Sequence, residues 1–190
     1  MARFLKKREQ NRGQSPGALI FIGNQKVESV QTRVIDYDAV NMTEHELLDI
    51  KDGSHFKKTE TVTWLNINGL HDTEIIKDVG MAFELHPLVM EDILNTGQRP
   101  KIEEFDSYIF IVLKMILFDK KTEMIVNEQL SIILGDNFLL TFQEQPGDVF
   151  DPVRERIRKQ KSRIRGSGTD YLAYALLDTV VDNYIYIIEL

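Results

Sequence analysis

The chain has 190 residues, of which 43% are hydrophobic and 28% are charged, a composition typical of a globular protein with one sizeable core. There are no cysteines, which excludes disulfides, zinc–thiolate sites and cysteine nucleophiles and favours a reducing compartment. The formal net charge of −7 favours cations over nucleic acid as partners.

The first 15 residues predict a disordered basic tail. Lysines and arginines recur in this segment, and no apolar stretch follows them, so it is not typical of a signal peptide. The longest apolar run, Tyr108–Phe118, is interrupted by Lys114 and is shorter than the roughly 20 residues needed to span a bilayer. We therefore expect a cytoplasmic chain that does not itself cross a membrane.

The next segments predict a hairpin and a short helix. Ala18–Ile22 and Ser29–Tyr37 have the composition of strands and flank a Gly-Asn turn, which predicts a β-hairpin. Thr43–Ile50 predicts a helix, because Glu46 follows Thr43 at the spacing of a capping box.

A strand and two consecutive helices are predicted after that. Thr61–Ile67 alternates in polarity and is rich in β-branched residues, as strands are. Asp72–Leu85 has apolar residues at helical spacing behind an acidic cap. His86-Pro87 then predicts a new helix on a different axis, ending near Asn95, because proline is tolerated at a first helical position but not in the middle of a helix.

Three strands are predicted in the second half of the chain. Tyr108–Phe118 is almost continuously apolar, which is typical of a strand covered on both faces. Ile125–Leu134 and Phe138–Gln143 follow, joined by the hairpin signal Gly-Asp-Asn. These three strands predict an antiparallel meander in the centre of a mixed sheet.

Two more helices are expected after the meander, over Val149–Arg163 and from Thr169, as the cap, to the end of the chain. The first contains most of a basic run, for which a solvated helix face is the default interpretation. The run consists of Arg154, Arg156, Arg158, Lys159, Lys161, Arg163 and Arg165.

The last helix is apolar on nearly all sides and reaches Glu189-Leu190 without a stop signal. We interpret it as a helix that continues and packs against other chains. Asp178 and Asp182 lie four residues apart on one face of it. From periodicity alone they mark a solvated stripe, and the alternative is that one of them binds a cation at a subunit interface.

A second acidic pair, Glu91-Asp92, lies in the helix that begins at Pro87. The apolar residues around the pair predict that both carboxylates point outward. Adjacent helical positions diverge by about 100°, so the two cannot chelate one ion tightly by themselves. A solvated face is again the default interpretation.

Several long segments agree in order and spacing with those of a known family. They are Thr63–Gly69, His86–Asn95, Gln98-Arg99-Pro100-Lys101, Tyr108–Met115, Gln143–Arg158 and Asp170–Asp182. Together these segments resemble the cytoplasmic N-terminal domain of the CorA family of magnesium and cobalt transporters. The resemblance runs from about Thr61 to the end, with a weaker match at Pro16–Ile22.

The resemblance implies an α+β fold, an α/β/α sandwich around a mixed, largely antiparallel sheet. This funnel domain would cover residues 16–168, and residues 169–190 would begin a long stalk helix that runs into the membrane. The family assembles as a pentamer at the cytoplasmic face of the cell membrane. The pore and both membrane helices would lie beyond Leu190.

The resemblance also implies a regulatory role for divalent cations, Mg²⁺ first and Co²⁺ as the alternative. Cations bound between neighbouring funnel domains hold the closed state. Asp92 matches the main interface ligand, and Glu91 and Asp178 match parts of a second site. An acidic partner for Asp92 would lie beyond Leu190. Carboxylate ligands suit a hard cation such as Mg²⁺.

Two other classes of function were weighed. A nucleic-acid module would use Arg154–Arg165, but no aromatic platform accompanies this run and the overall charge is wrong. A hydrolase using Glu91, Asp92 and His86 would need a nucleophile and an oxyanion site, and the sequence contains no such motif. The sequence therefore predicts a regulatory domain and not an enzyme.

Overall fold

The computed structural model describes residues 13, 15–46, 55–119 and 123–189, and it contains a seven-stranded sheet in the order β2-β1-β3-β7-β6-β5-β4. The strands are β1 (Gln31–Tyr37), β2 (Met42–Glu46), β3 (Val62–Asn68), β4 (Lys101–Phe105), β5 (Tyr108–Asp119), β6 (Met124–Gly135) and β7 (Phe138–Gln143). The helices are α1 (Thr73–Phe83), α2 (Pro87–Leu94), α3 (Asp151–Arg158) and α4 (Thr169–Ile188), with a 3₁₀ turn at Arg163–Gly166.

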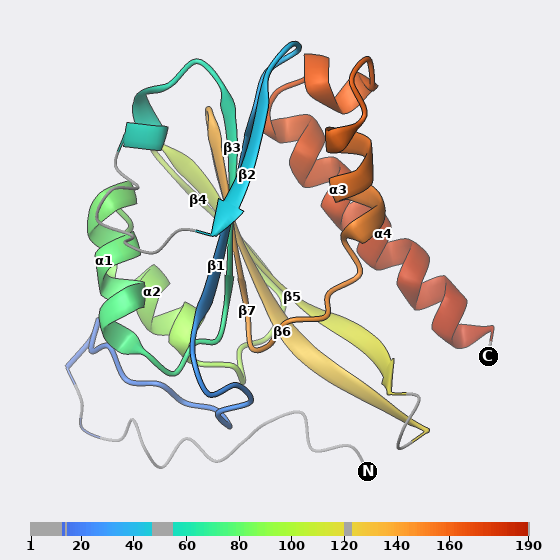
Figure 1. Ribbon diagram of the computed structural model, residues 1–190. Coiled ribbons are helices and arrows are strands. Elements are labelled where there is room, and N and C mark those ends of the chain that lie inside the picture. Colours follow the sequence, from blue (N-terminus) through green and yellow to red (C-terminus); the bar gives the residue numbers. More distant parts are fainter. Residues whose placement is uncertain (1–12, 14, 47–54, 120–122, 190) are drawn as a thin grey trace.

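The sheet is covered on both faces, as Figure 1 shows, by α1 and α2 on one side and by α3 and α4 on the other. The β3–β7 pair is parallel and the other neighbouring pairs are antiparallel. Each face has its own apolar core, centred on Phe83 and Phe110 beneath α1 and α2, and on Trp64 and Phe150 beneath α3 and α4. The predicted α/β/α sandwich with a mixed sheet is confirmed. The division of the chain at residues 15 and 168 stays a prediction.

The meander is present, but it lies to one side of the sheet. All six residues of β7 are buried, which fits its place in the middle of the order. β5 is next to the edge, because Lys101–Phe105 forms an edge strand that the sequence analysis did not predict. The far ends of β5 and β6 run on beyond the other strands toward the end of α4 (Figure 1). There the Asn183 Nδ2 donates to the Ile116 carbonyl at 2.5 Å.

The predicted hairpin of Ala18–Ile22 with Ser29–Tyr37 is wrong. Ile22 instead forms an isolated parallel bridge with Asn95, at the end of α2. Its amide donates to the Leu94 carbonyl at 2.9 Å, and its carbonyl accepts from the Thr96 amide at 3.0 Å. The end of α2 offers these backbone groups, and β1 pairs with β2 and β3 instead.

The predicted helix at Thr43–Ile50 is also wrong in its described part, since Met42–Glu46 is the edge strand β2. Residues 47–50 lie outside the described residues, as does almost all of the predicted basic tail. Asp38 explains the difference: its Oδ1 accepts from the amides of Val40 and Asn41, both at 2.6 Å, which closes a turn that leads back along β1. The pairing of β2 with β1 therefore outweighs the helix signal of the capping-box spacing between Thr43 and Glu46.

Helix α3 is shorter than predicted, and the basic run is not a uniform solvated face. Arg154 is buried and forms an ion pair with Asp148 at 2.6 Å, its guanidinium lying 5.0 Å from the centre of the Trp64 ring. Arg165 is buried as well and donates to the carbonyls of Asp38, Asn41 and Ile157. The charges at these two positions tie α3 and the following turn to the sheet.

The start of α4 differs from the prediction in one detail. Gly168 is the N-cap, and Thr169 is the first helical residue. The Thr169 hydroxyl donates to the carbonyls of Gly135 and Asp136, at 2.8 and 2.9 Å, and so anchors the helix to the β6–β7 turn. Within the described residues, we find no helix whose length and apolarity together would suffice to cross a bilayer.

Candidate cation-binding residues

Glu91 and Asp92 lie in the middle of α2, at half-buried positions outside the apolar contact of the helix with the core. Helix α2 begins at Pro87, with His86 as N-cap, whose Nδ1 accepts from the Leu88 amide at 3.2 Å. Val89, Ile93 and Leu94 face the core. This leaves the two acids at half-buried positions, less exposed than the sequence predicts, and it gives His86 a structural role at the helix start.

Both carboxylate oxygens of Asp92 accept hydrogen bonds from the segment that follows α2. Oδ2 lies 2.5 Å from the Lys101 ammonium, and Oδ1 accepts from the side-chain amide of Gln98. Lys101 also pairs with Glu103 at 2.8 Å. Although partial burial lowers the pKa of Lys101, the hydrogen bonds to Asp92 and Glu103 raise it above its ordinary value, so the ammonium stays charged. Asp92 is therefore engaged within its own chain.

A buried glutamine holds the Asp92 region against the sheet. Gln129, which has no exposed surface, donates from Nε2 to the backbone carbonyl of Asp92 at 3.2 Å. Its Oε1 accepts from the Gln98 amide and from Lys114 Nζ, each at 3.2 Å. The backbone of α2 at Asp92 and the start of the 98–101 segment are thus fixed to one side chain of β6.

Glu91 has a different role, because it binds the N-terminal segment. Its Oε2 accepts from the Gly17 amide at 2.7 Å. Gly17 has a φ of +80°, and an added Cβ would lie 2.9 Å from the Cβ of Pro87. The close approach and the positive φ both require glycine. Glu91 therefore fixes this segment on the outer side of α2.

Asp178 lies on the opposite layer of the sandwich, in α4, and is exposed. Within the described part of the chain its carboxylate makes no hydrogen bond or ion pair. Its exposed neighbours at spacings of three and four residues are Asp182 and the apolar side chains of Tyr174 and Val181. We name this surface the α4 stripe; it consists of Tyr174, Asp178, Val181, Ile185 and Ile188, and its apolar members are between 51% and 84% exposed.

One copy of the chain does not bring the three predicted ligands together. Glu91 and Asp92 lie on the α1–α2 side of the sheet, whereas Asp178 lies on the α3–α4 side. Among the described residues, no three Asp, Glu, His or Cys side chains are grouped closely enough to hold a metal ion. Any site built from these ligands needs a second copy.

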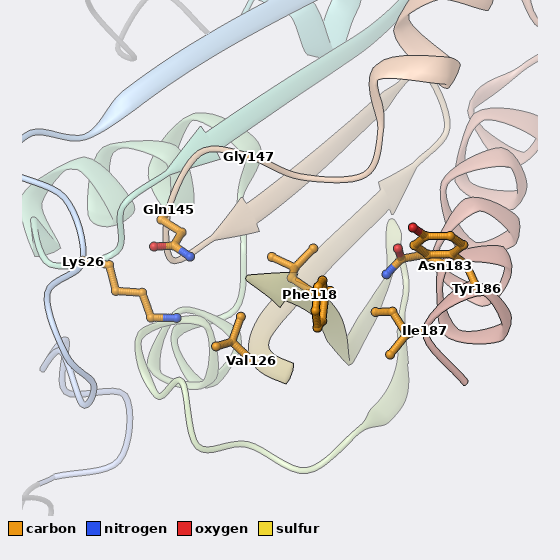
Figure 2. A pocket seen from close by; sticks show the side chains of 9 residues that line it. Lys26, Phe118, Val126, Gln145, Gly147, Asn183, Tyr186 and Ile187 are labelled. Atoms are coloured by element: carbon orange, nitrogen blue, oxygen red, sulfur yellow. The ribbon is translucent and has the colours of Figure 1, made fainter. Parts of the chain in front are cut away.

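A groove of about 560 Å³ runs between the far ends of β5 and β6 and the end of α4. Figure 2 shows Lys26 and Gln145 on one side of it, Asn183, Tyr186 and Ile187 on the other, and Phe118 and Val126 between them. None of the described residues that line it is acidic. This groove does not have the ligands of a hard cation.

A buried acidic pair lies behind the groove, next to Lys26. The Glu128 carboxylate accepts from the amides of Glu144 and Gln145 at 2.7 and 3.1 Å, and the Glu144 carboxylate accepts from the Gln129 amide at 3.0 Å. Lys26 pairs with Glu144 at 3.0 Å. Burial raises the pKa of Glu128 to about 7, against the opposing effects of Lys26 and the backbone amides.

The sequence analysis missed both Lys101 and Glu128. Glu128 could have been found by its spacing, because it shares the inward face of β6 with Leu130 and Ile132 at a period of two. Lys101 lies in the Gln98–Lys101 segment, which the sequence marks only as part of a family resemblance. Nothing in the local pattern shows that its ammonium turns back to Asp92.

Solved structures share this fold. The complete CorA magnesium transporter of Methanocaldococcus jannaschii matches with a TM-score of 0.63 and 18% identity, over 86% of this chain and 48% of that one. The soluble domain of the same protein matches with a TM-score of 0.58 and 18% identity, over 82% of this chain and 58% of that one. These likenesses define the class of the fold, an α/β/α domain of the kind found in the soluble part of a metal-ion transporter.

The sequence comparisons identify the family. Residues 59–190 match the family model described as CorA-like Mg²⁺ transporter protein. The chain is 44% identical over 184 residues to the cobalt/magnesium transport protein CorA of Thermotoga maritima, across 97% of this chain and 52% of that protein. The chain therefore belongs to the CorA-like family, as the resemblance implied. It spans about half the length of this relative, which is named as a transport protein and not as an enzyme.

Proposed function

We propose that this chain is the cation-sensing, regulatory domain of a magnesium/cobalt transporter, placed at the cytoplasmic face of the cell membrane. Copies of the chain assemble in a ring, and Mg²⁺ or Co²⁺ binds where neighbouring copies meet. Asp92, Glu91 and Asp178 are the ligands from this chain. Cation occupancy stabilises one arrangement of the copies and so controls the transporter. Transport itself falls to membrane-spanning segments beyond this chain.

The observation that carries this proposal is the setting of Asp178. A carboxylate in the middle of an exposed apolar stripe is unusual for a face that stays in water, because such patches mark interaction surfaces. Covering the α4 stripe with a neighbouring copy would partly bury Asp178. A buried carboxylate without a partner is costly, so the covered state favours a bound cation or an ammonium group beside it.

The placement of the ligands on opposite layers supports a ring. If the α1–α2 side of one copy faces the α3–α4 side of the next, the contact is head-to-tail, and contacts of this type close into rings when the rotation permits. Such a contact brings Glu91 and Asp92 toward the Asp178 of the neighbour. The family resemblance implies five copies.

The chemistry supports weak and reversible binding. Mg²⁺ usually keeps several waters and takes one or two carboxylates from the protein. A sensor has to release its ion when the cellular concentration falls, which a site with few protein ligands allows. The named relative transports cobalt and magnesium, so these are the first ions to test on this chain.

The test is a thermal melt of the gene's full-length protein with and without Mg²⁺. At a hundredfold excess over Kd, a cation that binds only the assembled form adds about 2.7 kcal/mol of stability. We expect Asp92→Asn and Asp178→Asn to lose most of this gain and to keep their fold without cation. Glu74→Gln, which removes an exposed carboxylate from α1, is the matched control and should keep the gain. If Asp92→Asn gains as much from Mg²⁺ as the unaltered protein, Asp92 is not a ligand.

A further inference from the structure

Both carboxylate oxygens of Asp92 accept a hydrogen bond from the chain itself. Lys101 Nζ lies 2.5 Å from Oδ2, and the amide of Gln98 donates to Oδ1. Both donors come from the Gln98–Lys101 segment, and the proposed sensing function gives that segment no role. A cation that binds Asp92 directly shares the carboxylate with these donors, and its charge repels the ammonium of Lys101.

Lys101 can leave Asp92 without losing all of its partners. Its ammonium lies 2.8 Å from Oε1 of Glu103, which is two residues further along the same face of β4. It also lies 5.3 Å from the centre of the Phe110 ring. The side chains of Lys101 and Glu103 are 27% and 44% exposed, so water also reaches the ammonium. An ammonium that leaves Asp92 therefore keeps the carboxylate of Glu103 as its partner.

We propose that Lys101 is a tethered competitor of the divalent cation: its ammonium group pairs with Asp92 and Glu103 together, and a cation that binds Asp92 leaves it with Glu103 alone. Lys101 thereby sets the cation concentration at which the site fills. This inference rests on the proposed function, because it takes Asp92 as a cation ligand.

Two effects make the competition strong. The ammonium has to be displaced from a short ion pair, and its positive charge stays within a few ångströms of the incoming cation. Removing a unit charge about 5 Å from a divalent ion, under the screening of water, changes the affinity by about tenfold. The positive charge therefore keeps a carboxylate site weak, as a sensor of an abundant ion requires.

Glu103 should act in the opposite direction. It offers Lys101 an alternative partner, and its own negative charge favours a cation nearby. Removing that charge leaves Lys101 more firmly on Asp92. Substitutions of Lys101 and of Glu103 should therefore change the cation affinity in opposite directions, which a general loss of structure would not produce.

The experiment measures the Mg²⁺ concentration at which the full-length protein becomes half-protected from limited proteolysis. For Lys101→Met, which keeps the aliphatic part of the side chain over Phe110, we expect the midpoint to fall about tenfold. For Glu103→Gln the midpoint should rise severalfold. Lys77→Met is the matched control, since it removes the same charge from a surface pair with Glu74 on α1; its midpoint should not move. Lys101→Gln repeats the test if Lys101→Met folds poorly.

Asp92→Asn separates the two ways in which the inference can fail. If Asp92→Asn abolishes protection while the midpoint of Lys101→Met stays the same or rises, Asp92 is a ligand and Lys101 does not compete. If Asp92→Asn is still protected at the midpoint of the unaltered protein, the proposed function itself fails, and the role of Lys101 with it. A tenfold fall for Lys101→Met with no fall for Lys77→Met supports the competition.

Discussion

The candidate acidic ligands in the two outer layers of the sandwich differ in whether their carboxylates have partners within the chain. On the α1–α2 side, Asp92 and Glu91 are each held by donors from their own chain, Lys101 and Gln98 for the first and the Gly17 amide for the second. On the α3–α4 side, Asp178 is exposed and its carboxylate makes no hydrogen bond within the described residues. Under the proposed function, a cation therefore meets an engaged carboxylate at α2 and an exposed carboxylate without such donors at α4.

This difference shows what a single copy of the chain can and cannot supply. The α2 acids are held in place by donors from their own chain. The carboxylate of Asp178 in the α4 stripe has no such donor among the described residues, so the proposed function requires a neighbouring copy to complete its surroundings. The four predictions below test this contrast, from the largest expected effect to the smallest.

The largest expected effect is a loss of stability on breaking the buried ion pair of the α3–α4 layer. Arg154 and Asp148 pair at 2.6 Å with side chains that are each 5% exposed, and Arg154 also covers the Trp64 ring. Removing one partner of a buried pair leaves the other charge uncompensated, so Arg154→Met should lower the free energy of unfolding by about 3–5 kcal/mol. Arg163→Met, at an exposed position over Tyr171, should cost less than about 1 kcal/mol. Similar small losses in urea denaturation of the two variants would show that the pair is not structural.

The second effect concerns the buried acid behind the groove. The pKa of Glu128 is raised by burial to about 7, above its ordinary value of 4.5. Its contribution to stability is therefore complete below about pH 4.5 and is lost as the pH rises through about 7, a change on the order of 3 kcal/mol. Glu128→Gln should lose less stability than the unaltered chain between pH 5 and pH 8. The other titrating groups are the same in both proteins, so equal losses would show that Glu128 is ionised in the folded state at pH 5.

Much of the fold could be predicted from the sequence, because most of its signals are local. The Asp72 cap and the His86-Pro87 restart each specify a helix boundary through a few neighbouring residues, and both lie where expected. The two errors had different causes. Ile22 pairs with the distant end of α2. β2 forms through the local Asp38 turn, whose hydrogen bonds have no periodic signature.

The candidate site was predictable only in part, for the same reason. The pattern of α2 places Glu91 and Asp92 away from the core, but it does not reveal that Lys101 and Gly17 bind them. The basic run gave a misleading signal, because the charge pattern alone does not distinguish exposed arginines from a buried one. Arg154 is buried against the Asp148 carboxylate and the Trp64 ring. Long side chains satisfy partners that are far away in sequence, and only the structure identifies these partners.

The third prediction addresses the α4 stripe as a contact between copies. Burying an isoleucine at an interface contributes about 1.5–3 kcal/mol, so Ile185→Ser should weaken the association of the full-length protein at least tenfold. Val40→Ser changes another exposed apolar residue, in the β1–β2 turn, and should leave association unchanged. Analytical ultracentrifugation measures both. Unchanged association of Ile185→Ser would mean that the stripe is not a contact surface, and Asp178 would lose the setting that makes it a candidate ligand.

The smallest effect compares the two layers directly, by the same substitution in a single copy of this chain. Glu91→Ala removes the acceptor of the Gly17 amide, and the loss of a half-buried hydrogen bond to a charged group should cost roughly 1–2 kcal/mol of local stability. The Gly17 amide should then exchange with deuterium at least fivefold faster, without a comparable change in the core strands. Asp178→Ala, at a position with no partner in the described chain, should change the free energy of unfolding by less than about 0.5 kcal/mol. If Asp178→Ala destabilises a single copy as much as Glu91→Ala does, Asp178 has a partner within its own chain, and the contrast between a closed α2 layer and an open α4 layer is wrong.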